Sequence, residues 1–214
     1  ANDGAGGSYT TSYSYWNGRL NRLGRGFLGF EKIRATDSRY AVLHGVALHR
    51  EITFRQDFPL IGMPDLTTLV RGDGRKLREE NPVWGARAMP AAGDPAADFH
   101  FPYLQSETVE EFESDPDGGA LGQLARTTRR NLYWNFNHGS PAREATAVFS
   151  PGSPAIFNTT INRVFDESAR ATANCLGLPV REDVTRDISS VGAATRSVQY
   201  TWSPLTCRQL TETT

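Results

Sequence analysis

The stretch LGRGFLGFEK, residues 23–32, has the glycine spacing G-x-G-x-x-G at Gly24, Gly26 and Gly29. In dinucleotide-binding proteins such glycines follow a buried strand and open a helix whose N-terminus holds the cofactor's pyrophosphate. Glu51 also lies near the distance along the chain at which an acidic side chain binds the ribose. The spacing therefore raises the hypothesis of a nucleotide-binding enzyme.

The residues around these glycines argue against that chemistry. Upstream, residues 8–15 alternate tyrosine or threonine at odd positions with serine or threonine at even positions, which is typical of a half-exposed antiparallel strand. The Trp-Asn-Gly at 16–18 then indicates a hairpin turn. Downstream, Gly29 would fall inside the first turn of the required helix, and no second β-α-β unit occurs. We expect Gly24, Gly26 and Gly29 to serve backbone geometry at a bend or bulge and to bind no nucleotide.

Histidines and acids with the spacing of a metal site are also few. His44 and His49, near Glu51, are separated by an odd number of residues, which on a strand puts the two rings on opposite faces. Asp115 and Asp117 lack the rest of a calcium loop's ligand series, so a turn is the simpler interpretation. No zinc-protease motif or nucleophile elbow occurs. The sequence predicts no catalytic residue, no cofactor, no metal and no enzyme activity.

His138 lies in the turn NHGSP beside Trp134 and Phe136. Exposed aromatic side chains of this kind can stack on sugars. We favour a hairpin whose aromatic side chains pack on the adjacent strand. An extracellular carbohydrate- or protein-binding β module that uses exposed aromatics stays open as the alternative function.

Composition excludes several classes of protein. The 214 residues are 38% hydrophobic and 22% charged, and the net charge of −1 gives no electrostatic case for nucleic acid or an acidic membrane. No apolar run in residues 1–214 approaches the length of a membrane-spanning helix, and we expect no signal peptide within them. Because the chain begins at Ala1 and stops in strand-like sequence, we expect it to be processed or excised from a longer polypeptide.

Alternation with a period of two residues is the dominant pattern. It predicts an all-β fold of long antiparallel strands and hairpins with little helix. Residues 121–132 and 165–177 fit a short helix and fit strand–loop–strand equally well. Residues 85–98, GARAMPAAGDPAAD, interrupt the alternation, and we expect a loop or insertion there. Apolar or aromatic side chains take alternate positions in 48–58, 132–136, 180–184 and 198–202.

A loose internal repeat runs through the chain. In each copy an aromatic strand ends at a polar turn, and the next strand carries alternating arginine, glutamate and threonine. Such self-similarity is typical of modular all-β architectures, in which each unit packs on its neighbours. The copies are residues 13–21, 134–149, 163–185 and 200–214.

The segments GRGFLGFEKIRATD (24–37) and REITFRQDFPLIGMP (50–64) resemble the segment that introduces the YD-repeat shell of bacterial toxin-complex B-type components and related Rhs proteins. Later units are similar to degenerate YD repeats, with 134–137 (WNFN) and 165–166 (FD) in the place of Tyr-Asp. The resemblance is strong at 24–64 and thin between 71 and 131. The tyrosine–aspartate pair itself is largely lost.

The resemblance implies long strands wound into a hollow cocoon that encloses a toxic C-terminal segment, without a cofactor. Residues 1–214 would then be one fragment of a larger β shell, structural in function, which encloses or presents another polypeptide segment. The implied partners are other parts of the same polypeptide, including an enclosed toxin segment, with no nucleic acid and no membrane insertion. The implied location is bacterial and secreted or at the cell surface.

The two cysteines, Cys175 and Cys207, occupy similar places in successive repeat copies. Equivalent positions in neighbouring units tend to lie side by side, and the separation is about one hairpin excursion and return. We predict that they form a disulfide if the protein is exported, which would stabilise the fold by about 3 kcal/mol. The alternative is two buried thiols in a reducing cytoplasm.

Overall fold

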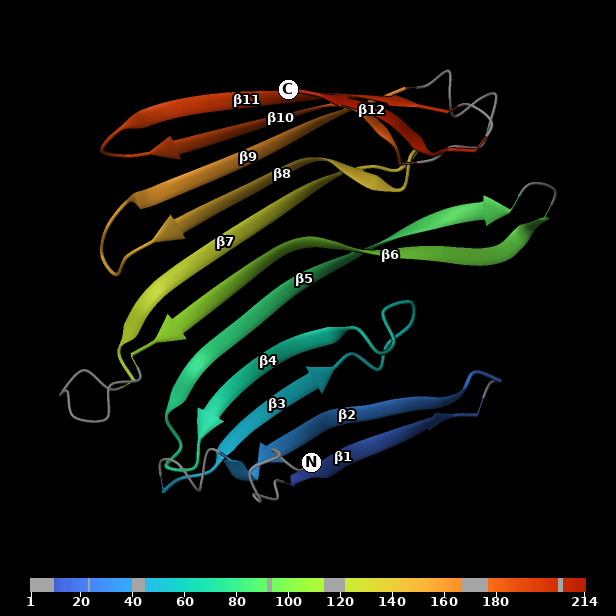
Figure 1. Cartoon of the computed structure of the whole chain (residues 1–214). Helices are drawn as coiled ribbons and strands as arrows, with labels where there is room; N and C mark the ends of the chain where they lie inside the picture. The colour runs from blue at the N-terminus through green and yellow to red at the C-terminus, as the bar shows by residue number, and fades with distance from the viewer. Residues whose placement is uncertain are drawn as a thin grey trace. The chain divides into compact units, whose positions relative to one another are not determined.

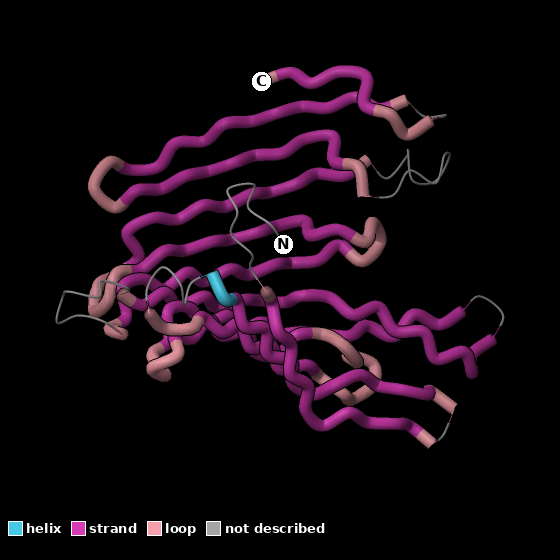
Figure 2. The backbone as a smooth tube through the Cα atoms, turned by 60° about the horizontal axis from the view of Figure 1, so that its bottom comes forward, coloured by secondary structure: helices cyan, strands magenta, loops and turns pink. Residues whose placement is uncertain are grey.

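The computed structural model describes residues 10–22, 24–39, 45–91, 94–113, 122–166, 177–203 and 206–214. Its regular elements are β-strands (Figure 1), and the helical residues that it describes are 38 and 39, drawn in cyan in Figure 2. The predicted all-β fold with little helix is confirmed. The strands are β1 (Thr11–Asn21), β2 (Gly26–Asp37), β3 (Leu48–Phe54), β4 (Pro64–Arg71), β5 (Lys76–Ala91), β6 (Asp94–Phe112), β7 (Leu124–Asn135), β8 (Ser140–Phe149), β9 (Ala155–Phe165), β10 (Pro179–Ile188), β11 (Gly192–Trp202) and β12 (Gln209–Thr213).

The chain divides into two units, Ala1–Thr127 and Thr128–Thr214, with the boundary inside β7. In the first unit β1 to β6 pair in the order of the sequence, and each pair is antiparallel. In the second unit β8 to β12 pair in the same way. Each unit is therefore a meander of neighbouring hairpins.

Both units have little buried apolar surface. Among the described residues the buried apolar side chains are Leu60 and Val198, each 7% exposed, and no described side chain is completely buried. Most sheet folds instead bury one face against a second layer of structure. The strands of each unit are therefore held mainly by ladder hydrogen bonds and by pairs of side chains on adjacent strands.

The prediction of a loop or insertion at residues 85–98 is wrong. β5 continues to Ala91 and β6 begins at Asp94, and the ladder pairs Ala88 with His100 and Pro90 with Asp98. Alanine, glycine and proline have a low intrinsic preference for strands, but this preference is weak compared with pairing to an adjacent strand. The arms of one long hairpin therefore run through the stretch.

The helical interpretation of residues 121–132 is also wrong, because β7 occupies most of them. The leucines of this segment fit both a helix and a strand, and the extended conformation prevails. The other helical candidate, 165–177, lies largely outside the described residues, since 167–176 are not described.

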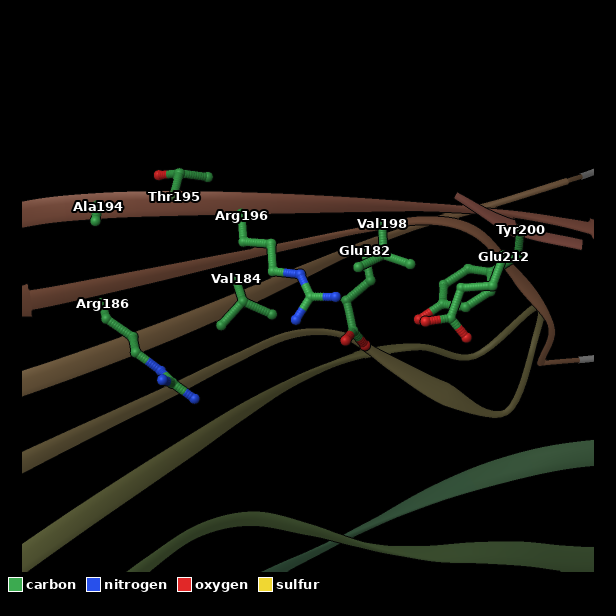
Figure 3. A pocket seen from close by; sticks show the side chains of 9 residues that line it. All are labelled: Glu182, Val184, Arg186, Ala194, Thr195, Arg196, Val198, Tyr200 and Glu212. Atoms are coloured by element: carbon green, nitrogen blue, oxygen red, sulfur yellow. The ribbon is translucent and has the colours of Figure 1, made fainter. Parts of the chain in front are cut away.

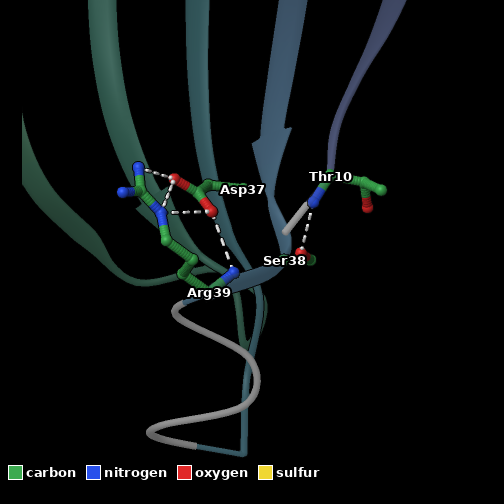
Figure 4. Close-up of polar contacts among 4 residues, drawn as sticks. All are labelled: Thr10, Asp37, Ser38 and Arg39. Carbon is green, nitrogen blue, oxygen red and sulfur yellow. Dashed lines mark hydrogen bonds and ion pairs between the residues drawn. The ribbon is translucent and has the colours of Figure 1, made fainter. Parts of the chain in front are cut away.

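The β1–β2 pair ends in a small network of polar contacts (Figure 4). The backbone N–H of Thr10 donates to Ser38 Oγ at 2.9 Å, and the backbone N–H of Ser38 donates to the Thr10 carbonyl at 3.1 Å. The Asp37 carboxylate accepts the Arg39 backbone N–H at 2.8 Å and also pairs with the Arg39 guanidinium. Side-chain and then backbone hydrogen bonds from Arg39 lower the pKa of Asp37. These contacts fasten the start of β1 to the end of β2.

Candidate functional site

A hollow of about 470 Å³ on one face of β10 and β11 is the candidate site (Figure 3). It lies on strands that the sequence predicted at 180–184 and 198–202, but sequence reasoning did not single out the hollow itself. Its charged, apolar and phenolic lining is shown in the figure. The lining residues are Glu182, Val184, Arg186, Ala194, Thr195, Arg196, Val198, Tyr200 and Glu212.

Strand geometry explains why these side chains gather on one face. Positions 182, 184 and 186 of β10 and positions 194, 196, 198 and 200 of β11 are alternate residues, so each set projects to the same side. The antiparallel register then sets Val184 opposite Arg196 and Arg186 opposite Ala194. Figure 3 shows Val184 between the two arginines, with the three side chains on the same side of the strands.

The two ends of the hollow differ in charge. At one end the Arg163 guanidinium donates to the Glu182 carboxylate at 2.8 Å. Burial, and then the negative charges of Glu182 and Glu212, raise the pKa of Tyr200, so this end is acidic. Arg186 lies at the other end, and Arg196 lies between Val184 and Glu182 (Figure 3). Neither arginine has an ion-pair partner among the residues that the structure describes. The hollow is therefore basic at one end and acidic at the other.

The β10–β11 hairpin has a counterpart in the first unit, the β4–β5 hairpin. Trp84 Nε1 donates to the carbonyl of Pro64, the first residue of β4, at 2.7 Å. Trp202 Nε1 donates to the carbonyl of Pro179, the first residue of β10, also at 2.7 Å. Each tryptophan-bearing strand also pairs irregularly with the strand that follows it: the shift directly precedes Trp84 in the β5–β6 pair and Trp202 in the β11–β12 pair.

The two hairpins also share their register. Thr67 pairs with Glu80, four residues before Trp84, and Glu182 pairs with Val198, four residues before Trp202. A glycine with positive φ stands two residues before each proline, 79° at Gly62 and 74° at Gly177. This repeat was not predicted, although the sequence carries its signal as GMP at 62–64 and GLP at 177–179, each followed further along by a tryptophan.

Gly24, Gly26 and Gly29 have φ values of 98°, 69° and 89°, which other residues rarely adopt. β2 begins at Gly26, so a strand and not a helix follows the glycine spacing. Gln56 Nε2 donates to the Gly29 carbonyl at 2.9 Å and fastens this bend to the segment after β3. That these glycines bind no nucleotide stays a prediction.

Glu51, the acid considered for a ribose, is engaged within the sheet. Arg34 Nε donates to its carboxylate at 2.6 Å, and Lys32 forms an ion pair with it. Burial acts to raise the pKa of Glu51, but the hydrogen bonds from Lys32 and Arg34 outweigh burial and the net pKa is lowered. The carboxylate is a member of a charged cluster on β2 and β3.

His49, considered as a metal ligand, lies on β3 with its Nδ1 2.9 Å from Thr36 Oγ1. His44, Asp115 and Asp117 lie outside the described residues. Within the described ranges no three histidine, cysteine or acidic side chains gather as metal ligands would. No helix among the described residues has the length and apolar character needed to cross a bilayer.

His138 is buried, with 3% of its surface exposed, and its ring stacks on Phe165 at 4.7 Å with an angle of 15° between the planes. This supports packing on a neighbouring strand over sugar binding at His138. Cys207 follows β11 with φ 55°. Cys175 lies outside the described residues, so the Cys175–Cys207 disulfide stays a prediction.

Comparison with known proteins gives a likeness in structure only. No protein-family model matches the chain, and no curated protein matches it. The crystal structure of TcdB2-TccC3 without its hypervariable C-terminal region matches 95% of the chain with a TM-score of 0.65. Those of TcdB2-TccC3 and TcdB2-TccC3-Cdc42 each match 91% with a TM-score of 0.63.

Sequence identity is 10% in all three comparisons, and the match spans 14% of each of those chains. Likeness at this identity concerns the fold alone. It confirms the resemblance predicted from residues 24–64 and from the later hairpins: the chain has the fold of a segment of the TcdB2-TccC3 toxin complex.

Proposed function

We propose that the chain is a wall segment of a bacterial YD-repeat or Rhs-like shell, secreted or at the cell surface, which encloses or presents another polypeptide segment. Its role is structural and not catalytic. The observation that carries the proposal is the near absence of buried apolar side chains among the described strands, in a fold shared with part of TcdB2-TccC3. A sheet with both faces exposed to solvent can form a wall that separates two aqueous compartments.

The side chains of the second unit support this function. One face of β10 to β12 is fastened by short polar groups: Thr185 to Thr195 at 2.8 Å, and Ser197 Oγ donating to Asp183 at 2.6 Å. The opposite face carries ion pairs such as Arg163 with Glu182. Both faces of these strands are therefore compatible with water.

The outermost strands of the units support the proposal in a second way. The side chains of β12 are all exposed, and those of β1 are exposed at every position except Asn21. Exposed strand edges attract further strands. In the proposed shell, neighbouring strands of the same polypeptide pair with these edges.

Light scattering after size exclusion tests the proposal on the 214-residue chain. We expect concentration-dependent association through the edges, reduced by the variant Tyr13→Lys/Tyr15→Lys, because lysine on an edge strand opposes pairing. The control, Val191→Lys, places a lysine at a side chain that is 80% exposed and lies in a turn, away from the strand edges. A stable monomer at all concentrations would contradict the proposal.

A carbohydrate- or protein-binding module is the second candidate, favoured by exposed aromatics on β1 and β2. Tyr13, Tyr15 and Phe27 are 58%, 51% and 59% exposed. The rings of Tyr13 and Tyr15 stack at 6.5 Å, which resembles a sugar-binding platform. Saturable binding of a polysaccharide, abolished by Tyr13→Ala/Tyr15→Ala, would favour this function; the wall proposal predicts no such binding.

A further inference from the structure

We infer that the β10–β11 hollow is a docking site for an extended polypeptide segment that carries an acidic side chain next to an apolar one. The inference rests on the proposed function in one respect, because the docked segment is taken to belong to the polypeptide that the shell encloses or presents. The evidence for it is the pair of arginines in the hollow, Arg186 and Arg196, and the valine side chains next to them.

The arginines of the hollow stand out against the other arginines of the second unit. Arg130 pairs with Glu144 at 2.7 Å, and Arg163 pairs with Glu182 at 2.8 Å. Arg186 and Arg196 are exposed and have no carboxylate partner within the described residues. They therefore offer two guanidinium groups to a carboxylate from outside the sheet.

In the first unit the residue equivalent to Arg196 is Arg78, and its charge is neutralised by acidic side chains of the same unit. Leu69 pairs across the strands with Arg78, as Val184 pairs with Arg196. Arg78 donates to Glu80 at 2.8 Å and lies 3.5 Å from Glu111. At the place of Glu80 the second unit has Val198, so the internal partner of the arginine is replaced by an apolar side chain.

That replacement also defines the apolar part of the ligand. Val184 and Val198 lie beside the arginines; Val198 is only 7% exposed, whereas Val184 is half-buried and still meets water. An apolar side chain placed over Val184 removes apolar surface from water, which a free inorganic anion cannot do. Glu182 and Glu212 repel a second carboxylate, so the acidic residue of the segment faces the end of the hollow at Arg186, with Arg196 next along the strands (Figure 3).

The hollow on the opposite face of the second unit lacks these features. Its lining includes Arg143, but that guanidinium lies over the Tyr133 ring at 5.3 Å. The remaining side chains there are small or polar, and two of them are Asn158 and Thr160. An acidic and apolar segment is therefore expected on the β10–β11 face bearing Arg186 and Arg196.

Photo-crosslinking in the natural polypeptide that carries this sequence tests the inference. A diazirine-bearing amino acid replaces Ala194, at the base of the hollow, or Thr195, whose side chain points to the other face (Figure 3). We expect position 194, and not position 195, to crosslink to an acidic and apolar segment outside residues 155–214. Mass spectrometry identifies the crosslinked residues.

Charge reversal supplies the controls. Arg186→Glu/Arg196→Glu is expected to lower the crosslink yield about fivefold, within the range of two exposed ion pairs. Arg78→Glu, the matched change in the first unit, leaves the yield unchanged. If the reversed variant does not fold, as judged by hydrogen exchange in β10 and β11, the neutral Arg186→Gln/Arg196→Gln replaces it with a smaller loss.

Crosslinks from position 194 that stay within β9 to β12, that reach a basic segment, or that ignore the arginine substitutions would overturn the inference. A closed shell seen by cryo-electron microscopy together with such crosslinks would leave the wall function standing and remove only the docking site. The two proposals therefore fail separately.

Discussion

The β4–β5 and β10–β11 hairpins share a frame and differ in what they expose. Each opens with Gly-x-Pro and is closed by a tryptophan that donates to the proline carbonyl at 2.7 Å. On this frame Arg78 is neutralised by Glu80, whereas Arg196 stands beside Val198. The comparison teaches that the backbone contacts of the repeat fix the register, while the alternate side chains are free to form internal ion pairs or an open site.

The largest expected effect comes from removing the tryptophans. Trp84→Ala or Trp202→Ala should each lower the local free energy of unfolding by about 2–3 kcal/mol, less than for a fully buried ring, because both side chains are half-buried. Hydrogen exchange of each hairpin in the natural polypeptide measures the change.

The conservative substitutions Trp84→Phe and Trp202→Phe separate the two contributions of each ring. They keep most of the packing and lose the indole hydrogen bond, which should cost about 1 kcal/mol. Similar losses in both hairpins are expected from their shared geometry. A large loss of local stability in one hairpin and none in the other would show that the two hairpins are not structurally equivalent.

The glycines before the prolines should respond unequally. Gly62→Ala is expected to cost about 1–2 kcal/mol for its positive φ alone, since an added Cβ meets nothing within 4 Å. Gly177→Ala has a similar φ, and its Cβ would in addition lie 2.8 Å from Ser140 Oγ and 3.2 Å from the His138 carbonyl. Hydrogen exchange should therefore show a larger loss at Gly177, and equal losses would contradict the packing at that position.

The arginines test the difference between the hairpins directly. Arg78→Ala should lower the local stability of β5 by about 0.5 kcal/mol, because Arg78 is partly exposed and its ion pairs are screened by solvent. Arg196→Ala should change the stability of β11 very little, since no described carboxylate pairs with it. Equal effects, measured by hydrogen exchange at low salt, would remove the distinction between a closed and an open hairpin.

The smallest effect is a pH dependence confined to the first unit's charged cluster. The pKa of Glu51 is lowered in the folded state, so its contribution is present above the unfolded pKa, about 4.3, and is lost as pH falls through the folded value. The wild type should therefore lose more stability in β2 and β3 than Glu51→Gln does between pH 6 and pH 3. Exchange rates corrected for their intrinsic pH dependence measure this, and parallel profiles would refute it.

Much of the fold was readable from period-two alternation, because alternation reports directly on which side chains share a face. It predicted strands at 48–58, 180–184 and 198–202, where β3, β10 and β11 lie. It failed at 85–98, where the strand conformation depends on pairing between the two arms of a hairpin and not on the residues' own preferences.

The candidate site was less predictable than the fold. The placement of Val184 opposite Arg196 depends on the register between two strands, which the period of either strand does not reveal. The charge state of the hollow depends further on whether Val or Glu stands at position 198, next to an arginine. The two Gly-x-Pro segments can be found in the sequence. That each marks the start of an equivalent hairpin becomes clear only from the structure, where a tryptophan on the next strand donates to the proline carbonyl.

Cryo-electron microscopy of the natural polypeptide is the most direct test of the central claim, that this chain is a wall segment. The account predicts a closed shell in which the strands of residues 10–214 have solvent or enclosed polypeptide on both faces and further strands along their edges. A map in which these residues form a separate module, with one face packed as a core against another layer and no shell around it, would contradict the account.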